Sequence, residues 1–203
     1  MSSEVKANKV SPATGTDFTF GDSGDTFTVP SGATLAVTGA TVTGLSAGKV
    51  LQVVSAVKTD TASTTSATLA STGLEASITP SATSSKVLIL INAHVGTKDD
   101  VAPYFQVNRG STVLTGALGD AASSRVRTAG RTQQQYSIYS IFPVPIIYLD
   151  SPSSTSALTY KLMWAQGGPT GGFVSYINRT LQDLDSAIYA RSASTITVME
   201  IAG

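Results

Sequence analysis

The chain has 203 residues, of which 41% are hydrophobic and only 13% charged, and its 13 Lys and Arg balance its 13 Asp and Glu. This balance excludes a broad basic surface for nucleic acid. The absence of cysteine excludes disulfides and thiolate metal sites. The first residues, MSSEVKANKVSPATG, lack the apolar run of a signal peptide, and the longest apolar stretch, residues 87–91, is too short to span a membrane. We therefore expect a protein that is made in the cytoplasm and is not inserted into a membrane.

Residues 1–48 read in short phrases such as DTFTVPSG and ATLAVTG, in which apolar residues alternate with polar ones and a glycine follows. Alternation is typical of strands, and the glycines indicate turns. Phe27, Val29, Leu35 and Val37 would point to one side. Because such phrases are too short to bury a face alone, they need to stack on each other or on sibling chains. We interpret the segment as a β-rich shaft and predict that these four side chains pack between the chains of a trimer.

Residues 49–203 have the pattern of one globular β domain, with short alternating runs separated by loops rich in Gly, Ser and Asp. We predict strands over residues 50–57, 74–79, 86–95, 104–109, 112–115, 135–148, 156–165, 173–178 and 195–201. Short strands joined by long loops favour an antiparallel β-sandwich of the jelly-roll type. The predicted fold is all-β, with a shaft over residues 1–48 and a C-terminal β-sandwich knob over residues 49–203.

Three local patterns refine this prediction. Residues 87–91 are apolar at every position and so on both faces, which indicates a central strand. Pro143 and Pro145 cannot donate hydrogen bonds to a neighbouring strand, so we expect a bend, a bulge or a sheet edge there. Residues 181–190 indicate a short helical turn.

The sequence GDSG at residues 21–24 matches the nucleophile loop of a trypsin-like protease, which needs a histidine base beside Ser23. The chain has one histidine, His94, and it follows Ser23, the reverse of the trypsin-like order. Ser23 also precedes the globular domain. We therefore interpret GDSG as a turn, and His94 as a structural or loop-edge residue in preference to a metal ligand.

The acidic residues offer weaker alternatives. Asp99 and Asp100 could join a calcium site or a glycan contact, but a solvated loop tip is the simpler interpretation. Asp183 and Asp185 could form a carboxylate pair of the glycosidase type, although capping or turn roles fit their spacing better. Asn178 begins a glycosylation sequon, which needs a secretion route to matter. No pattern indicates a cofactor, and we expect a protein that is not an enzyme.

Three arginines cluster in the loop sequence SSRVRTAGRTQQQY. They could contact an anionic sugar or a carboxylate across a subunit interface, and we prefer structural pairing. Loops on rigid β scaffolds commonly carry recognition, which makes the loops at 97–103 and 119–131 candidate receptor contacts. The candidate contact residues are Lys98, Asp99, Asp100, Arg125, Arg127 and Arg131.

Several phrases of the chain resemble those of a known class of virion proteins. The segment SEVKANKVSPATGTDFTFGDSGDTFTVPSGATLAVTGATVTGL resembles the N-terminal segment of small tail-fibre proteins of tailed phages, particularly marine and cyanobacterial ones. The rest resembles a β domain at the C-termini of phage fibre proteins, through the phrases LEASITPSATSSKVLILINAHV, FQVNRGSTVL, LDSPSSTSALTYKL, YINRT and ARSASTITVMEIAG.

This resemblance implies a non-enzymatic virion component, usually a homotrimer, whose C-terminal domains form a distal knob. It implies that the N-terminal segment binds other virion proteins and that the knob meets a host cell-surface glycan or protein. It supplies no catalytic residues. At 203 residues, the chain is short for a complete tail fibre. A fibre tip, a head fibre or fibre base, and a capsid decoration protein are therefore the alternatives.

Overall fold

The computed structural model describes residues 28, 29, 31–33, 49–97, 102–132, 137–167 and 174–203. The chain divides into two units, Met1–Thr43 and Gly44–Gly203. In the first unit the described residues include a turn at Ser31 and Gly32, where Gly32 has a φ of 86°. The predicted shaft and the predicted boundary after residue 48 lie almost wholly outside the described residues.

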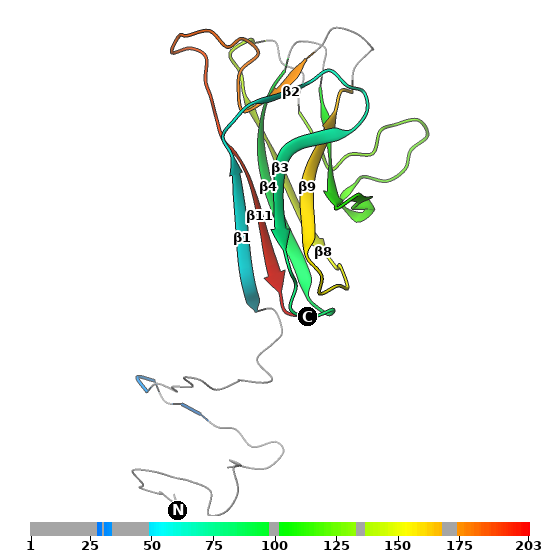
Figure 1. Cartoon of the computed structure of the whole chain (residues 1–203), viewed down its shortest axis with the longest axis vertical. Coiled ribbons are helices and arrows are strands. Elements are labelled where there is room, and N and C mark those ends of the chain that lie inside the picture. The colour runs from blue at the N-terminus through cyan, green and yellow to red at the C-terminus, as the bar shows by residue number, and fades with distance from the viewer. Residues whose placement is uncertain (1–27, 30, 34–48, 98–101, 133–136, 168–173) are drawn as a thin grey trace, which may run out of the picture. The chain divides into compact units, whose positions relative to one another are not determined.

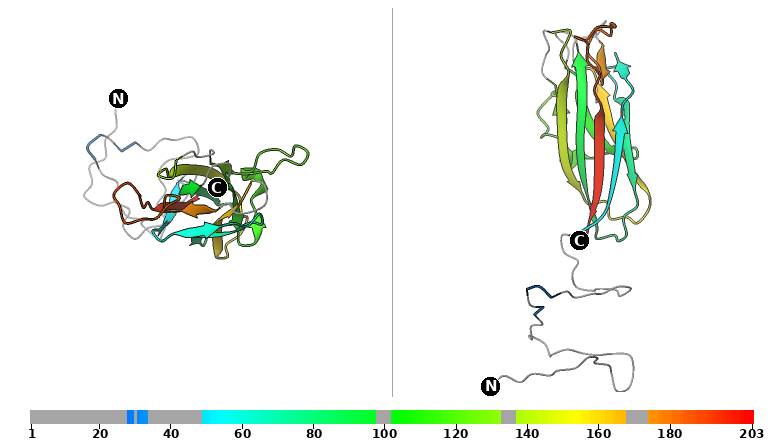
Figure 2. Two further views of the ribbon diagram at one scale, coloured as in Figure 1. Left: turned by 90° about the horizontal axis from the view of Figure 1, so that it is seen from above. Right: turned by 90° about the vertical axis from the view of Figure 1, so that its left-hand side faces the viewer.

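The second unit consists of two antiparallel sheets that face each other across one core (Figures 1 and 2). The larger, six-stranded sheet has the order β1-β11-β4-β10-β2, and β8 pairs with the other edge of β4. Its strands are β1 (Val50–Lys58), β2 (Ala62–Thr64), β4 (Lys86–Thr97), β8 (Phe142–Asp150), β10 (Ser175–Ile177) and β11 (Ser194–Ile201).

The smaller, five-stranded sheet has the order β3-β9-β5-β6, and β7 also pairs with β5. Its strands are β3 (Ala70–Ile78), β5 (Tyr104–Arg109), β6 (Thr112–Val113), β7 (Gly130–Arg131) and β9 (Leu158–Ala165). One 3₁₀ turn, Thr115–Ala117, follows β6. The prediction of an all-β fold is confirmed, and the arrangement is compatible with a β-sandwich.

Most predicted strands are present, with corrected ends. The prediction of a strand over 135–148 is wrong at its start, because the described residues 137–141 form a turn and β8 begins at Phe142. The prediction of a strand over 112–115 ends too late, since Thr115 starts the 3₁₀ turn. Residues 181–190 form turns and bends and no helix. The short strands β2 and β7 were not predicted.

Pro143 and Pro145 lie on an edge strand. A sheet edge was one of the three predicted alternatives, beside a bend and a bulge. Among the described strands, β8 pairs only with β4, in continuous register from Val87 opposite Asp150 to Val95 opposite Phe142. Pro143 and Pro145 lie opposite His94 and Asn92 without a shift of register. Proline is tolerated on an edge strand because one side of such a strand needs no ladder hydrogen bonds.

The core is built from alternate residues of both sheets. On β4 the inward side chains are at positions 87, 89, 91, 93 and 95, and each is at most 3% exposed. The smaller sheet contributes Phe105 and Trp164, whose ring centroids are 6.5 Å apart in a stacked arrangement. β4 pairs with β11 and then β10 along one edge and with β8 along the other, which confirms that residues 87–91 are in a central strand.

The carboxylate of Glu200 is buried at the Lys49 end of the domain. Glu200 is 1% exposed, and its carboxylate accepts hydrogen bonds from Gln52 Nε2 at 2.9 Å, from the backbone N and the Oγ of Ser81 at 2.6 Å each, and from Ser85 Oγ at 2.7 Å. Burial alone would raise the pKa of Glu200, but these hydrogen bonds outweigh it and hold the pKa at about 2. The ionised group therefore ties β1 and β11 to the β3–β4 connection.

A second polar cluster links the two sheets. Asp150, on β8, accepts hydrogen bonds at one oxygen from Arg109 Nη1 at 2.7 Å and from Tyr160 OH at 2.8 Å. Burial and the neighbouring Asp150 raise the pKa of Tyr160, so the phenol remains a donor. Because Arg109 and Tyr160 belong to the smaller sheet, the cluster fixes how the sheets align.

We predict that Glu200→Gln lowers the free energy of unfolding by about 2 kcal/mol at neutral pH, because a charged acceptor becomes an amide whose N–H group faces other donors. Since folding lowers the pKa of Glu200 from 4.5 to about 2, the stabilisation is fully present above about pH 4.5 and is lost as the pH falls toward 2. Urea unfolding at about pH 7 and about pH 3 measures the effect.

The difference between Glu200→Gln and the unchanged protein should be smaller at the lower pH. Glu75→Gln is the control, since Glu75 is an exposed carboxylate 3.6 Å from Lys161 Nζ and its loss should cost no more than about 0.5 kcal/mol. Equal destabilisation by Glu200→Gln at both pH values would contradict a lowered pKa of Glu200 in the folded protein.

Candidate functional site

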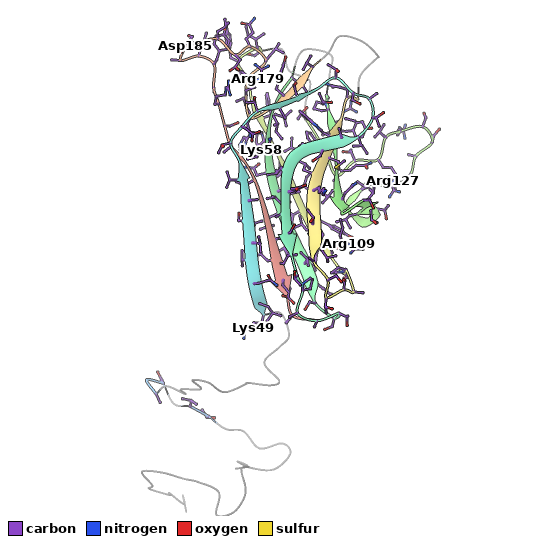
Figure 3. All side chains as sticks on the ribbon, viewed as in Figure 1. Lys49, Lys58, Arg109, Arg127, Arg179 and Asp185 are labelled. Atoms are coloured by element: carbon purple, nitrogen blue, oxygen red, sulfur yellow. The ribbon has the colours of Figure 1, made fainter. Side chains whose placement is uncertain are left out.

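The loop of residues 178–193 and the connection at residues 59–61 lie together at the end of the domain opposite Lys49. Figure 3 shows Arg179 and Asp185 at one end of the strands and Lys49 at the other. At the Lys49 end, the backbone N of Ala202 donates to the carbonyl of Lys49 at 2.9 Å, so the C-terminus lies beside the start of β1. We name the described residues 59–61 and 178–193 the distal loop end.

A carboxylate shared by two arginines organises the distal loop end. Asp183 accepts a bidentate contact from Arg191, with the Arg191 Nε at 2.9 Å from Asp183 Oδ1. Arg179 Nη1 lies 3.4 Å from Asp183 Oδ2. Arg191 remains 56% exposed, whereas the Arg179 side chain is 17% exposed. The loop therefore carries two guanidinium groups around one carboxylate, with Arg191 facing solvent.

Arg179 is fixed from a second direction by an aromatic ring. Its Cζ lies 3.6 Å from the centroid of the Tyr176 ring, a cation–π contact. The backbone at Arg179 also packs closely on β4, because a Cβ at Gly96 would overlap the Arg179 carbonyl oxygen. Only glycine fits at position 96 without moving this segment.

Asn178 anchors the base of the loop. It is 0% exposed, and its φ of 63° lies in the left-handed region that asparagine tolerates better than most residues. Its Nδ2 donates to the carbonyls of Lys58 and Asp60 at 2.7 and 3.0 Å, and its Oδ1 accepts from Ser194 Oγ at 2.6 Å. The side chain of the predicted sequon is thus buried and fully hydrogen-bonded.

Two shallow clefts flank the loop. One, of about 290 Å³, is lined by Thr61, Ala62, Ser63, Tyr176, Arg179 and Asp183. The other, of about 470 Å³, is lined by Asp183, Leu184, Asp185, Ser186, Ala187, Tyr189 and Arg191. Their hydroxyl, guanidinium and phenol groups can donate hydrogen bonds to a polar or anionic ligand.

The predicted contact residues lie elsewhere or outside the described residues. Arg127 projects on a side loop away from the distal loop end (Figure 3) and donates to the carbonyls of Gly119 and Thr115 at 2.7 and 3.3 Å. Arg131 is on β7, and Arg125 is exposed on the same side loop. The residues predicted as contacts or shaft packing that lie outside the described ranges are Lys98, Asp99, Asp100, Phe27, Leu35 and Val37.

Val29, by contrast, is described, and it is 37% exposed. Ser23 is outside the described residues, so its predicted turn stays a prediction. The Nδ1 of His94 lies 2.8 Å from the Ala193 carbonyl, and its backbone N donates to Ser194 Oγ at 2.9 Å. His94 therefore takes part in the hydrogen bonds that join β4 to the start of β11.

Sequence reasoning missed Tyr176, Arg179 and Arg191. The signal was the spacing of opposite charges, since Arg179 and Arg191 flank Asp183 at four and eight residues. The described residues contain no group of three or more side chains that could hold a metal ion, and they include no helix with the length and apolar character that a bilayer span requires.

Comparison with known proteins yields no relative: no protein-family model matches the sequence, and no curated protein matches it.

We predict that Asn178→Ala lowers the free energy of unfolding by about 3 kcal/mol, because buried hydrogen bonds are lost and alanine is strained at positive φ. Asn178→Gly removes the same hydrogen bonds without the strain and should cost about 1 kcal/mol less. Denaturant unfolding measures both. Ser153→Ala is the control, since Ser153 has a φ of 49° but is exposed. Losses below about 1 kcal/mol for both Asn178 variants would contradict the anchoring role.

Proposed function

We propose that this protein is a structural component of a tailed-phage virion, a homotrimeric fibre whose distal β-sandwich is exposed for host-surface attachment. The observation that carries the proposal is that the start of the domain and its distal loop end lie at opposite ends of the strands. The described part of the domain begins at Lys49, beside the C-terminus, and the distal loop end is at the opposite end of the strands (Figure 1). An N-terminal segment bound to a particle would thus leave the loops free to meet a cell surface.

The strand order supports a jelly-roll topology for the sandwich. Consecutive long strands alternate between the sheets, from β1 to β3, from β3 to β4, from β4 to β5 and from β8 to β9. The order β1-β11-β4-β8 then faces β3-β9-β5-β6, as two interlocked Greek keys require. The phrases that resemble phage fibre domains fall on these strands, with KVLILINAHV in β4 and STITVMEI as β11.

The first test is the location of the protein on the particle. We predict that cryo-EM of virions labelled with an antibody against the chain places the label at the outer end of a tail-associated fibre. Virions treated with antibody from non-immunised animals are the control. Label on the capsid instead would support the alternative, a capsid decoration, head-fibre or fibre-base protein with a purely structural role, and would contradict the tail fibre.

The second test is competition for host cells. We predict that the purified full chain reduces adsorption of the phage, and that Arg191→Ala competes about ten-fold more weakly, equivalent to about 1.4 kcal/mol, because an exposed guanidinium of the distal loop end is lost. Lys49→Ala removes one exposed cation from the opposite end and should compete like the unchanged protein. No competition by the unchanged chain would argue against a receptor-binding role.

A further inference from the structure

The two sheets differ in the chemistry of the faces that they turn away from the core. On the smaller sheet this outer face is polar, as expected for a sheet with one solvated side. Glu75 lies opposite Lys161, and the hydroxyls of Ser77 and Thr159 are 2.7 Å apart. On the four long strands of the larger sheet, β1, β11, β4 and β8, the outer face has one such hydroxyl pair, with Ser55 Oγ 3.0 Å from Thr197 Oγ1, and otherwise carries more apolar side chains.

Cross-strand register assembles the outer face of the larger sheet into rows. One row, all apolar, joins Val53, Met199, Leu88 and Leu149. Residues that are paired across strands lie on the same face, so these four side chains are neighbours. The row is uncharged from edge to edge.

The next row contains Ser55, Thr197, Leu90 and Ile147, and the following one Val57, Thr195, Asn92 and Pro145. We name these three rows the outer face. All of its side chains are uncharged, and its large members at the two edges are strongly exposed: Ile147 by 72%, Val57 by 60%, Val53 by 55% and Leu149 by 45%. The apolar side chains are contiguous along the first row and continue to Leu90 and Ile147 in the second. Isolated exposed apolar residues are ordinary, but a contiguous apolar patch of this kind marks an interaction surface.

The outer face has the size of a small interaction patch. Four strands about 4.8 Å apart make a face roughly 19 Å wide, and the five residues from Val53 to Val57 at about 3.3 Å each extend it by roughly 16 Å. The resulting area of roughly 300 Å² per copy is in the range of surface patches that are often functional, and it is smaller than the about 800 Å² per partner of a standard interface.

We propose that the outer face is an interface with a second copy of this chain. Like faces can pack together because neither carries a charge that would have to be desolvated. The chain has zero net charge, so long-range repulsion between copies is absent. Addition of a strand at the β8 edge is disfavoured by Pro143 and Pro145, so we assign the contact to the face and not to this edge. This inference rests on the homotrimer of the proposed function and names the surface that holds it together.

The absence of cysteine makes the contact directly testable in the full chain. Val53→Cys and Ile147→Cys place single thiols at opposite edges of the outer face, and Val126→Cys places one on the side loop, where Val126 is 55% exposed, as Val53 is. With a flexible bis-maleimide we expect covalently linked copies for the Val53→Cys and Ile147→Cys variants. We expect no linked copies for Val126→Cys. No linked copies at 53 and 147, or equal linking at 126, would overturn the proposal.

A second measurement covers the case in which residues 1–48 also hold copies together. Ile147→Asp should lower either the mass of the assembly in sedimentation or its midpoint of thermal unfolding, whereas Val126→Asp should change neither. An unchanged mass and midpoint for Ile147→Asp, or a monomeric starting protein, would overturn the proposal. Linked pairs without trimers would support the interface and contradict the homotrimer. The position on the particle is measured separately, so the interface and the proposed function can fail independently.

Discussion

The domain depends on β4, whose backbone is hydrogen-bonded along both edges. It extends over twelve residues, about 40 Å at the rise of a strand. β11 and then β10 occupy one edge, and β8 occupies the other for nine paired positions. Because β4 is central, its inward residues form the middle of the core and its outward residues form the middle of the outer face. Its length also separates the two ends of the domain, which have different chemistry.

The end beside Lys86 is closed by buried hydrogen bonds and the other by exposed ion pairs. Glu200 is almost completely buried, and each of its bonds comes from a neutral donor, so the end is stable without a partner charge. Beyond Thr97, the distal loop end is held at its base by buried Asn178, while Arg191 is exposed above it. A rigid base below exposed polar groups is the arrangement that loop recognition requires.

Local sequence pattern was enough to predict most strands but not the contacts between distant segments. β5 has the predicted bounds, since its alternation ends at a turn containing Gly110. The start of β8 was wrong, because a run of apolar and aromatic residues around Tyr139 has the period of a strand, yet residues 137–141 form a turn. Of the candidate site, Asp183 was noticed as one of two spaced carboxylates. Its pairing with Arg191 was missed, because charge spacing alone does not show that a loop brings two residues eight positions apart into contact.

An interface on the outer face constrains how copies can be arranged. A rotation axis parallel to β4 would keep the distal loop ends of all copies on one side and their Lys49 ends on the other. An axis across the strands would point the loop ends in opposite directions, so half of them would face the particle. Only the parallel axis is consistent with N-terminal attachment and with several loop ends meeting one cell surface, where linked weak contacts gain affinity through effective concentration. In the proposed assembly, the outer face would join the copies and the polar distal loop end would contact the cell surface.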